Sequence, residues 1–424
     1  MQEVEKLYFF DTKKKKVMPY ALLSLEVENF RGIKHLKIDG IPADTKWIFL
    51  TGENGFGKTS ILQKIAHSLL NNGAGYLSVL EREAIFKTII IQDNILYIKD
   101  KSKKWWGNSR PYDPLYEIRE FHFNFNKDEV VFNRTPYFIK TLPPFYTSCY
   151  GSSRLDITAA ANDDALNQQN PLDNLFGKPN SYLLNINHTL KEAFAYNKDR
   201  FEQILEFFKA ILPNLADIKI EVNNGEPEVV YLEQDETGHG YNPISFSQLA
   251  AGYRNILAMF GDMIIRLQKL QPEVKSISDL KGIVIIDEIE LHLHPKYQKW
   301  LPSKLSELFP NIQFIVSTHS PIPLLGAPKE SVFLKVNRNE EQGITVERID
   351  IDIAGLNPNM VLTSPVFGFD DIFSSSKDKN TVIRKEDVYN DALFYKKLDE
   401  RLDEHVGSER EQELVKLMRP TAQK

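Results

Sequence analysis

The segment "LTGENGFGKTSIL", residues 50–62, places the strongest constraint on how this chain folds. Residues 52–59 fit the pattern G-x-x-x-x-G-K-[ST], in which glycines let successive backbone N–H groups point toward one spot without a Cβ clash. The apolar run "KWIFL" precedes the segment, and "TSILQKIAHSLLNN" follows with apolar residues at helical spacing. A strand, a glycine-rich loop and a helix in this order favour a phosphate site at the helix N-terminus over a glycine-rich turn without a ligand.

Two side chains of this loop carry the expected chemistry. A lysine at the position of Lys58 reaches the β- and γ-phosphates of a nucleoside triphosphate, and the Thr59 hydroxyl ligates Mg²⁺. The residues expected to hold the nucleotide here are Gly52, Glu53, Asn54, Gly55, Phe56, Gly57, Lys58, Thr59 and Ser60.

A second segment, "GIVIIDEIELHLHP", supplies the acids that such a loop needs. Four apolar residues lead into Asp287, as expected for a buried parallel strand that ends in an acid. Asp287 is the predicted second residue of the Mg²⁺ site. Glu288 follows where a carboxylate can polarise a water, or accept its proton, as that water attacks the γ-phosphate.

Composition excludes several classes of protein. The chain of 424 residues has 42% hydrophobic and 26% charged residues, which is ordinary for a globular protein with one large or two modest domains. It has no apolar run near the roughly 18 residues that span a bilayer, and its start lacks the zones of a secretion signal. The single cysteine, Cys149, indicates the cytoplasm. The net charge of −6 argues against general adhesion to nucleic acid.

The order of patterns predicts an α/β fold with a mixed central sheet, an antiparallel β subdomain and a helical subdomain. We expect a nucleotide-binding lobe over residues 1–182, with the antiparallel strands inserted from about residue 76. A second lobe over residues 183–366 contains the helical region and the acidic strand. Residues 367–424 form a polar and helical tail that is a candidate partner interface.

Four segments resemble the ATP-binding-cassette (ABC) ATPases of the SMC, RecF and OLD branch. The segments are "LEVENFRGIKHLKI", "GENGFGKTS", "IIDEIELHLHPKYQ" and "FPNIQFIVSTHSP". The chain looks most similar to the compact ATPases of bacterial antiphage systems, such as OLD-like proteins, Septu PtuA and PARIS AriA. The resemblance implies a P-loop NTPase fold with an ABC-type head, which takes ATP and Mg²⁺ and hydrolyses ATP. We expect this hydrolysis to be slow and regulatory.

The resemblance also implies further site residues. His319 matches the switch histidine at the γ-phosphate, and Arg31 matches an arginine near the nucleotide. Gly252, in "LAAGYRN", matches the signature loop that covers the γ-phosphate of a second subunit. The family's serine is replaced there by Ala250, which removes one hydrogen-bond donor worth about 0.5–1.5 kcal/mol. The family's segment that crosses to the other subunit corresponds to Glu290, His292 and His294.

Several motifs have a structural alternative that we favour. His292 and His294 are a weak zinc signal without cysteines nearby. Asp350 and Asp352 match the D-x-D of a Toprim nuclease, but alternation of acids on the solvent face of a strand explains them as well. Gln92 is a weak candidate for the family's glutamine loop. Arg154 either reaches the nucleotide or caps the β subdomain, with both readings open.

The leading functional hypothesis is an ATPase head that forms a homodimer or higher oligomer on ATP and regulates a separate effector, a nuclease or toxin. The main alternative is a RecF-like repair ATPase that acts on DNA directly. A self-contained nuclease and a scaffold that binds ATP without hydrolysis are further alternatives. SMC-type arms are absent, because only residues 155–248 separate "YGSSR" from the signature-like loop and they contain no sustained heptads. In the tail, Leu398, Leu402 and Val406 form a stripe that either docks on its own domain or faces a partner.

Overall fold

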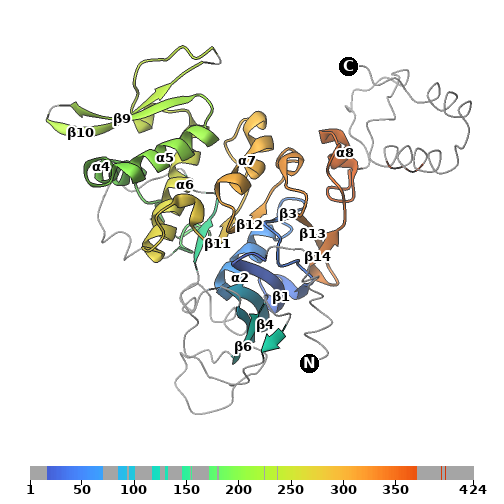
Figure 1. Cartoon of the computed structure of the whole chain (residues 1–424). Helices are drawn as coiled ribbons and strands as arrows, with labels where there is room; N and C mark the ends of the chain where they lie inside the picture. Colours follow the sequence, from blue (N-terminus) through green and yellow to red (C-terminus); the bar gives the residue numbers. More distant parts are fainter. Residues whose placement is uncertain are drawn as a thin grey trace, which may run out of the picture. The chain divides into compact units, whose positions relative to one another are not determined.

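The computed structural model describes most of the chain (Figure 1). The described residues are 17–69, 85–92, 95–100, 117–124, 129–131, 146–152, 154, 171–178, 181–223, 225–235, 237–369, 393 and 397. The chain forms two compact units, residues 1–352 and 353–424. The lobe boundaries expected from the sequence stay predictions.

Twelve strands within the described residues of the first unit form one mixed sheet, in the order β7-β6-β5-β4-β1-β2-β14-β13-β3-β12-β11-β8. The strands are β1 (Tyr20–Phe30), β2 (Ile33–Ile38), β3 (Trp47–Thr51), β4 (Ile85–Gln92), β5 (Ile95–Asp100), β6 (Glu117–Asn124), β7 (Glu129–Val131), β8 (Thr147–Tyr150), β11 (Gly282–Ile286), β12 (Ile312–Ser317), β13 (Val332–Asn339) and β14 (Gly343–Ile349). From β13 through β3, β12 and β11 to β8 all neighbours are parallel, and the remaining pairs are antiparallel.

The parallel strands are apolar because both of their faces are covered. Every residue of β3, β11 and β12 is buried, which explains their continuous hydrophobic runs. The one amide in β12, Gln313, is fully buried and satisfied, since it accepts from Leu22 N at 2.8 Å and donates to the Thr45 carbonyl at 2.9 Å. The strand predictions for these three segments are confirmed.

The predicted antiparallel strands are present, but they do not form a separate sheet. Strand β4 pairs with β1 along most of its length, so β4 to β7 extend the central sheet. A separate two-stranded sheet is formed by β9 (Leu215–Asn223) and β10 (Glu226–Glu233). Sequence periodicity identifies strands but not their neighbours, so it could not decide which sheet they join.

The described helices of the first unit are α2 (Lys58–Leu69), α4 (Ile186–Tyr196), α5 (Lys198–Ile211), α6 (Ala251–Leu270) and α7 (Pro295–Leu308), with short 3₁₀ turns η3 (Phe246–Gln248), η4 (Ile277–Asp279) and η5 (Pro323–Gly326). Helices α4, α5 and α6 pack together beside β9 and β10 and form the predicted helical region (Figure 1). Asn185 and Asn197 cap the starts of α4 and α5 through their side-chain oxygens. No helix in the described part of the chain is long and apolar enough to cross a bilayer.

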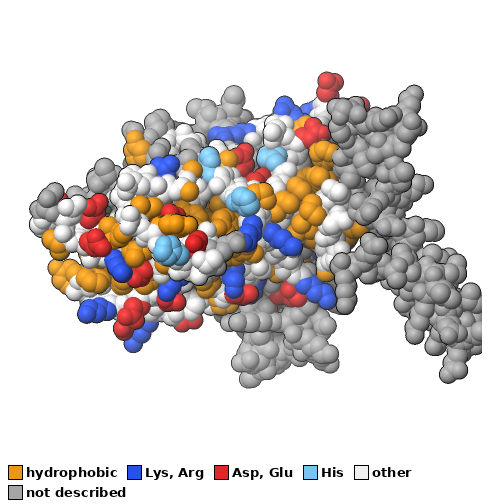
Figure 2. Space-filling model, turned by 90° about the horizontal axis from the view of Figure 1, so that it is seen from above, with side chains coloured by type: hydrophobic (Ala, Val, Ile, Leu, Met, Phe, Trp, Pro, Cys, Tyr) orange, Lys and Arg blue, Asp and Glu red, His pale blue; other side chains and the backbone are white. Residues whose placement is uncertain are grey.

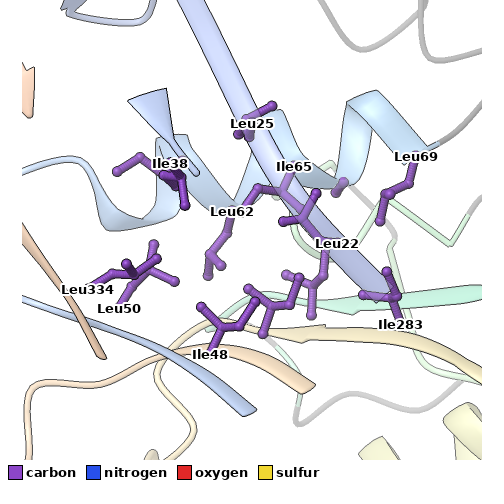
Figure 3. Close-up of a cluster of buried hydrophobic side chains, with 14 of the residues drawn as sticks. Leu22, Leu25, Ile38, Ile48, Leu50, Leu62, Ile65, Leu69, Ile283 and Leu334 are labelled. Atoms are coloured by element: carbon purple, nitrogen blue, oxygen red, sulfur yellow. The ribbon is translucent and has the colours of Figure 1, made fainter. Parts of the chain in front are cut away.

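Helix α2 carries the phosphate loop and is held by its apolar face. The helical spacing of apolar residues in this segment predicts one face with Ile61, Ile65, Ala66, Leu69 and Leu70; the first four are at most 1% exposed, and Leu70 lies outside the described residues. Figure 3 shows α2 side chains packed with Leu22 and Leu25 of β1 and with Ile48 and Leu50 of β3. Each such side chain contributes about 1.5–3 kcal/mol on burial, so the loop before α2 is attached to a rigid support.

The second unit contains α8 (Pro358–Thr363). Asn357 caps this helix by accepting a hydrogen bond from Met360 N at 2.9 Å. The hydrophobic stripe predicted in the tail lies outside the described residues.

On the face shown in Figure 2, basic and acidic side chains are interspersed, together with several histidines. Such mixing agrees with a net charge of only −6 for the whole chain.

The thiol of Cys149 offers a test of packing in β8. Cys149 is 2% exposed, and burial raises the pKa of its thiol to about 12. We expect iodoacetamide at pH 8 to leave the folded protein unlabelled, because the reactive thiolate is scarce and inaccessible. Labelling becomes rapid once urea unfolds the chain, and mass spectrometry resolves both cases since the chain has one cysteine. Rapid labelling of the native protein would contradict the burial of β8.

Candidate functional site

The carboxyl ends of four parallel strands meet at one edge of the sheet. Residue pairing aligns Tyr150 with Ile286, Ile286 with Val316, and Ser317 with Leu50. The chain segments that follow these strands therefore lie side by side. In open α/β sheets, ligands bind at this edge, and the sequence-predicted loop and acids are the segments found there.

The glycine-rich loop follows β3 and requires glycine at two points. Gly52 has φ +133°, and a Cβ there would lie 2.4 Å from the Val336 carbonyl oxygen. Gly57 has φ +100°, and a Cβ would lie 2.3 Å from Ile344 Cδ1. Because β13 and β14 press on the loop at these positions, any side chain would displace it. Glu53, Asn54 and Gly55, at the tip of the loop, are exposed.

The Lys58 side chain folds back across the loop. Its Nζ donates to the carbonyl oxygens of Gly52 at 2.8 Å and Glu53 at 2.9 Å, and lies 3.3 Å from His319 Nδ1. Lys58 is 5% exposed. Burial lowers its pKa, opposed by the nearby carboxylates, of which Asp287 is the strongest. A cation held by weak carbonyl acceptors is ready to exchange them for phosphate oxygens.

The first acid, Asp287, connects the start of α2 to the end of β12. It accepts a hydrogen bond from Thr59 Oγ1 at 2.6 Å through Oδ2 and one from the Ser317 hydroxyl through Oδ1. The Ser317 hydroxyl in turn accepts from Glu288 N at 2.8 Å. The parallel register of β11 and β12 produces this contact, because it sets the residue after Ile286 beside Ser317. Sequence reasoning missed Ser317, whose only signal was its place in "IVSTHS" before His319.

Glu288 and His319 face each other beside Lys58. The distance from His319 Nε2 to Glu288 Oε1 is 4.0 Å, and both side chains are about one-third exposed. Glu288 has φ +50°, a left-handed conformation that costs an L-residue about 1–2 kcal/mol. A partly exposed carboxylate beside a histidine and an ammonium is open to water. The predicted site residues Lys58, Thr59, Asp287, Glu288 and His319 are thus together, although their roles stay predictions.

Glu290 has a contact that the sequence did not suggest. Its Oε1 accepts the backbone N–H of His319 at 2.6 Å. Its Oε2 is buried and has no hydrogen-bond partner within the part of the chain that the structure describes. Glu290 therefore holds the His319 loop in place, in addition to its predicted membership of the crossing segment.

Besides His319, the resemblance predicts two further site residues, Arg31 and Gly252, and these make different contacts. Arg31, at φ +43°, donates to Gln63 of α2 through Nη1, and its guanidinium lies 5.5 Å from the ring centroids of Phe30 and Phe176. Gly252 is the second residue of α6, where a Cβ would lie 2.7 Å from the His292 carbonyl oxygen. Ala250 is the N-cap of α6 and makes no side-chain cap.

The remaining candidate residues lie at or next to the ends of strands and helices. Asp350 and Asp352 are exposed and follow the end of β14, and Asp350 pairs with Arg348 at 3.2 Å. His294 caps α7 by accepting from Lys296 N at 3.2 Å. Gln92 ends β4, where its backbone pairs with Tyr20. Among the described residues no group of three or more His, Cys, Asp or Glu could hold a metal ion.

Arg154 is the residue for which two readings were open. It is 0% exposed, and burial lowers its pKa to about 10. It donates to the carbonyl oxygens of Gly151, Asp287 and Glu288. Arg154 is therefore enclosed behind the acids, and its described contacts are with the protein.

A glycine-rich loop before a helix, a buried lysine over that loop and two acids at the end of an adjacent parallel strand define a P-loop ATPase. The model of the AAA ATPase domain family matches residues 86–322, over half of the chain, and the chain belongs to this family. The match includes Asp287, Glu288 and His319.

Sequence relatives include the Septu protein PtuA of Bacillus mycoides (strain KBAB4), with 27% identity over 82% of this chain and 45% of that protein. The retron Vc95 probable ATPase of Vibrio cholerae is 31% identical over 40% of this chain and 35% of that protein. The Septu protein PtuA of Bacillus thuringiensis is 26% identical over 77% of this chain and 84% of that protein. The chain thus spans less than half of the first two relatives. The resemblance to compact antiphage ATPases is confirmed.

Two solved structures align with this structure over most of the chain. An SMC head bound to the C-terminal winged-helix domain of ScpA aligns with a TM-score of 0.46 and 14% identity, covering 78% of this chain and 98% of that one. The recombination mediator RecF aligns with a TM-score of 0.42 and 11% identity, covering 80% and 100%.

Proposed function

We propose that this ATPase acts as a Mg²⁺-dependent head that associates with a second copy on ATP and regulates a separate effector, a nuclease or toxin, in antiphage defence. The observation that carries the proposal is the contact of Thr59 with Asp287, which joins the phosphate loop to the acidic strand within reach of Glu288. The relationship to Septu and retron ATPases supports the defence role. A cytoplasmic setting, expected from the single cysteine, is part of the proposal.

Binding of the triphosphate follows from the loop. Backbone N–H groups at the start of α2 and the Lys58 ammonium attract the phosphates. Lys58 Nζ exchanges its contacts with two carbonyl oxygens for phosphate oxygens, which bind an ammonium more strongly because they are charged.

The donors at the Mg²⁺ position fit that ion. Thr59 Oγ1 and Asp287 Oδ2, a hydroxyl and a carboxylate oxygen 2.6 Å apart, are the hard ligands that Mg²⁺ takes in nucleotide sites. These two residues would hold Mg²⁺, which neutralises phosphate charge when bound.

Hydrolysis depends on Glu288. A water attacks the γ-phosphorus, its proton passes to the Glu288 carboxylate, and the bond to the bridging oxygen breaks to release ADP and phosphate. His319 lies between Lys58 and Glu288, so a γ-phosphate bound at Lys58 also contacts the imidazole. The presence or loss of the γ-phosphate then shifts His319, and Glu290, which binds the backbone N–H of His319, transmits that shift to the crossing segment.

Association of two heads is the step that a partner could detect. The exposed face beside Gly252 includes His292 and His294, and it matches the signature and crossing segments of related heads. Because Ala250 provides no hydroxyl, only backbone N–H groups at the start of α6 remain to contact the partner's γ-phosphate. Weak closure and slow turnover follow.

The test is light scattering on the Glu288→Gln protein, which keeps ATP bound. We expect the mass to double with Mg²⁺ and ATP but not with Mg²⁺ and ADP, or with ATP and EDTA. The product of the neighbouring gene, added to both forms, should bind one of them preferentially. A mass that is unchanged by ATP in a protein that binds ATP would reject the association, and equal binding of the neighbour to both forms would reject the regulation.

A further inference from the structure

The guanidinium of Arg154 bonds to four acceptors that come from three segments of the chain. Nη1 donates to Gly151 O at 2.9 Å and Asp287 O at 2.5 Å, and Nη2 donates to Glu288 O at 2.5 Å. Nε donates to Asn255 Oδ1 at 3.1 Å. Every nitrogen of the group is engaged, and the side chain has no exposed surface.

Two of these acceptors control the conformation of Glu288. The Asp287 carbonyl belongs to the peptide plane before the Glu288 Cα, and the Glu288 carbonyl belongs to the plane after it. A rigid planar guanidinium that binds both carbonyls sets the rotation of one plane against the other, which is φ and ψ of Glu288. That residue is in the left-handed region at φ +50°, which it holds only where its surroundings enforce it.

The remaining nitrogen of the guanidinium, Nε, bonds to a residue near the start of α6. Asn255 accepts from Arg154 Nε and donates through Nδ2 to the Leu291 carbonyl at 2.7 Å. Asn255 is 1% exposed and lies three residues after Gly252, whose backbone is pressed against the His292 carbonyl. The start of α6 is thus hydrogen-bonded to the segment after Glu288 through Asn255, and its backbone lies close to that segment at Gly252.

We propose that Arg154 is a positioning residue that holds Glu288 in its working conformation, and that Asn255 links this residue to the start of α6. A displacement of the signature-like loop is thereby passed to Glu288. This inference rests on the proposed role of Glu288 as the base. Both side chains are buried and their described hydrogen bonds go to protein groups, so we expect both to act on the rate of hydrolysis and not on binding.

A purely structural role is the competing explanation, since Arg154 also faces the charges of Glu290, Asp287 and Glu288. Arg154→Lys separates the two roles because it keeps a cation but loses the planar fork that holds two carbonyls. We expect kcat to fall about 10- to 100-fold, the range for small displacements of a reacting group, while the Kd for Mg²⁺ and ATP stays within about twofold.

Asn255→Asp provides the test of the link. Its Oδ1 still accepts from Arg154, but the donor to the Leu291 carbonyl is lost, so kcat should fall while the Kd holds. Arg266→Lys is the matched control, because Arg266 is also a largely buried arginine, paired in α6 with Asp262 at 2.7 Å. We expect it to lower the melting temperature and to leave kcat unchanged.

The inference is overturned if Arg154→Lys and Asn255→Asp keep the parent kcat, or if kcat, Kd and melting temperature all shift together, as a general loss of the folded structure would cause. If Arg154→Lys does not fold, Asn255→Asp alone tests the inference: kcat should fall while the Kd for Mg²⁺ and ATP stays the same. Glu288→Gln is measured in parallel. Turnover at the parent rate in that variant rejects the proposed base, whereas an inactive Glu288→Gln beside a fully active Arg154→Lys rejects only the positioning role.

Discussion

Replacing Glu288 by glutamine is expected to leave ATP binding intact and to reduce ATP turnover by about 10²–10⁴-fold, the usual contribution of a general base. The two side chains have the same shape, so the hydrogen bond of Glu288 N to Ser317 and the backbone at φ +50° are kept. The amide cannot accept the proton of the attacking water. Phosphate release measures turnover, and calorimetry with ATP and Mg²⁺ measures binding.

Glu307→Gln is the control for this variant. Glu307 is an exposed residue of α7 that pairs with Lys304 at 2.8 Å, and its loss should change neither quantity. If Glu288→Gln releases phosphate at the parent rate, another group takes the proton and the mechanism above is wrong.

The second large effect is expected for Lys58→Ala, which should weaken binding of ATP with Mg²⁺ by about 10²–10⁴-fold. Each charge-assisted hydrogen bond to phosphate is worth about 1.5–3 kcal/mol, and the lysine is expected to make two. The fold should survive, because among the described residues the Lys58 side chain bonds to the loop and His319, and it lies outside the apolar contacts of α2.

Thermal melting distinguishes a loss of ATP binding from a loss of the fold. ATP with Mg²⁺ should raise the melting temperature of the parent protein but not of Lys58→Ala, since ligand stabilisation follows affinity. Lys304→Ala, on the exposed surface of α7, should behave as the parent does. A Lys58→Ala protein that keeps the parent affinity would mean that the triphosphate is not bound at this loop.

The parts of the site that the sequence predicted are those encoded by adjacent residues. The glycines at 52 and 57 require φ values that few other residues adopt, so a short motif is enough to identify the loop. The pair Asp287 and Glu288 follows a strand that is apolar throughout because both its faces are covered. The antiparallel strands β4 to β7 were predicted as elements, whereas their pairing to β1 depends on contacts between distant segments.

The chain alone therefore determined the phosphate loop, the acid pair and the buried strands, because each depends on local conformation and on the period of apolar residues. Only the tertiary structure decided that Ser317 binds Asp287, that Glu290 holds His319, and that Arg154 encloses the backbone of Glu288. These partners are 29 to 134 positions apart. Sheet register and helix packing set which polar groups become hydrogen-bond partners. No local pattern in the sequence encodes these pairings.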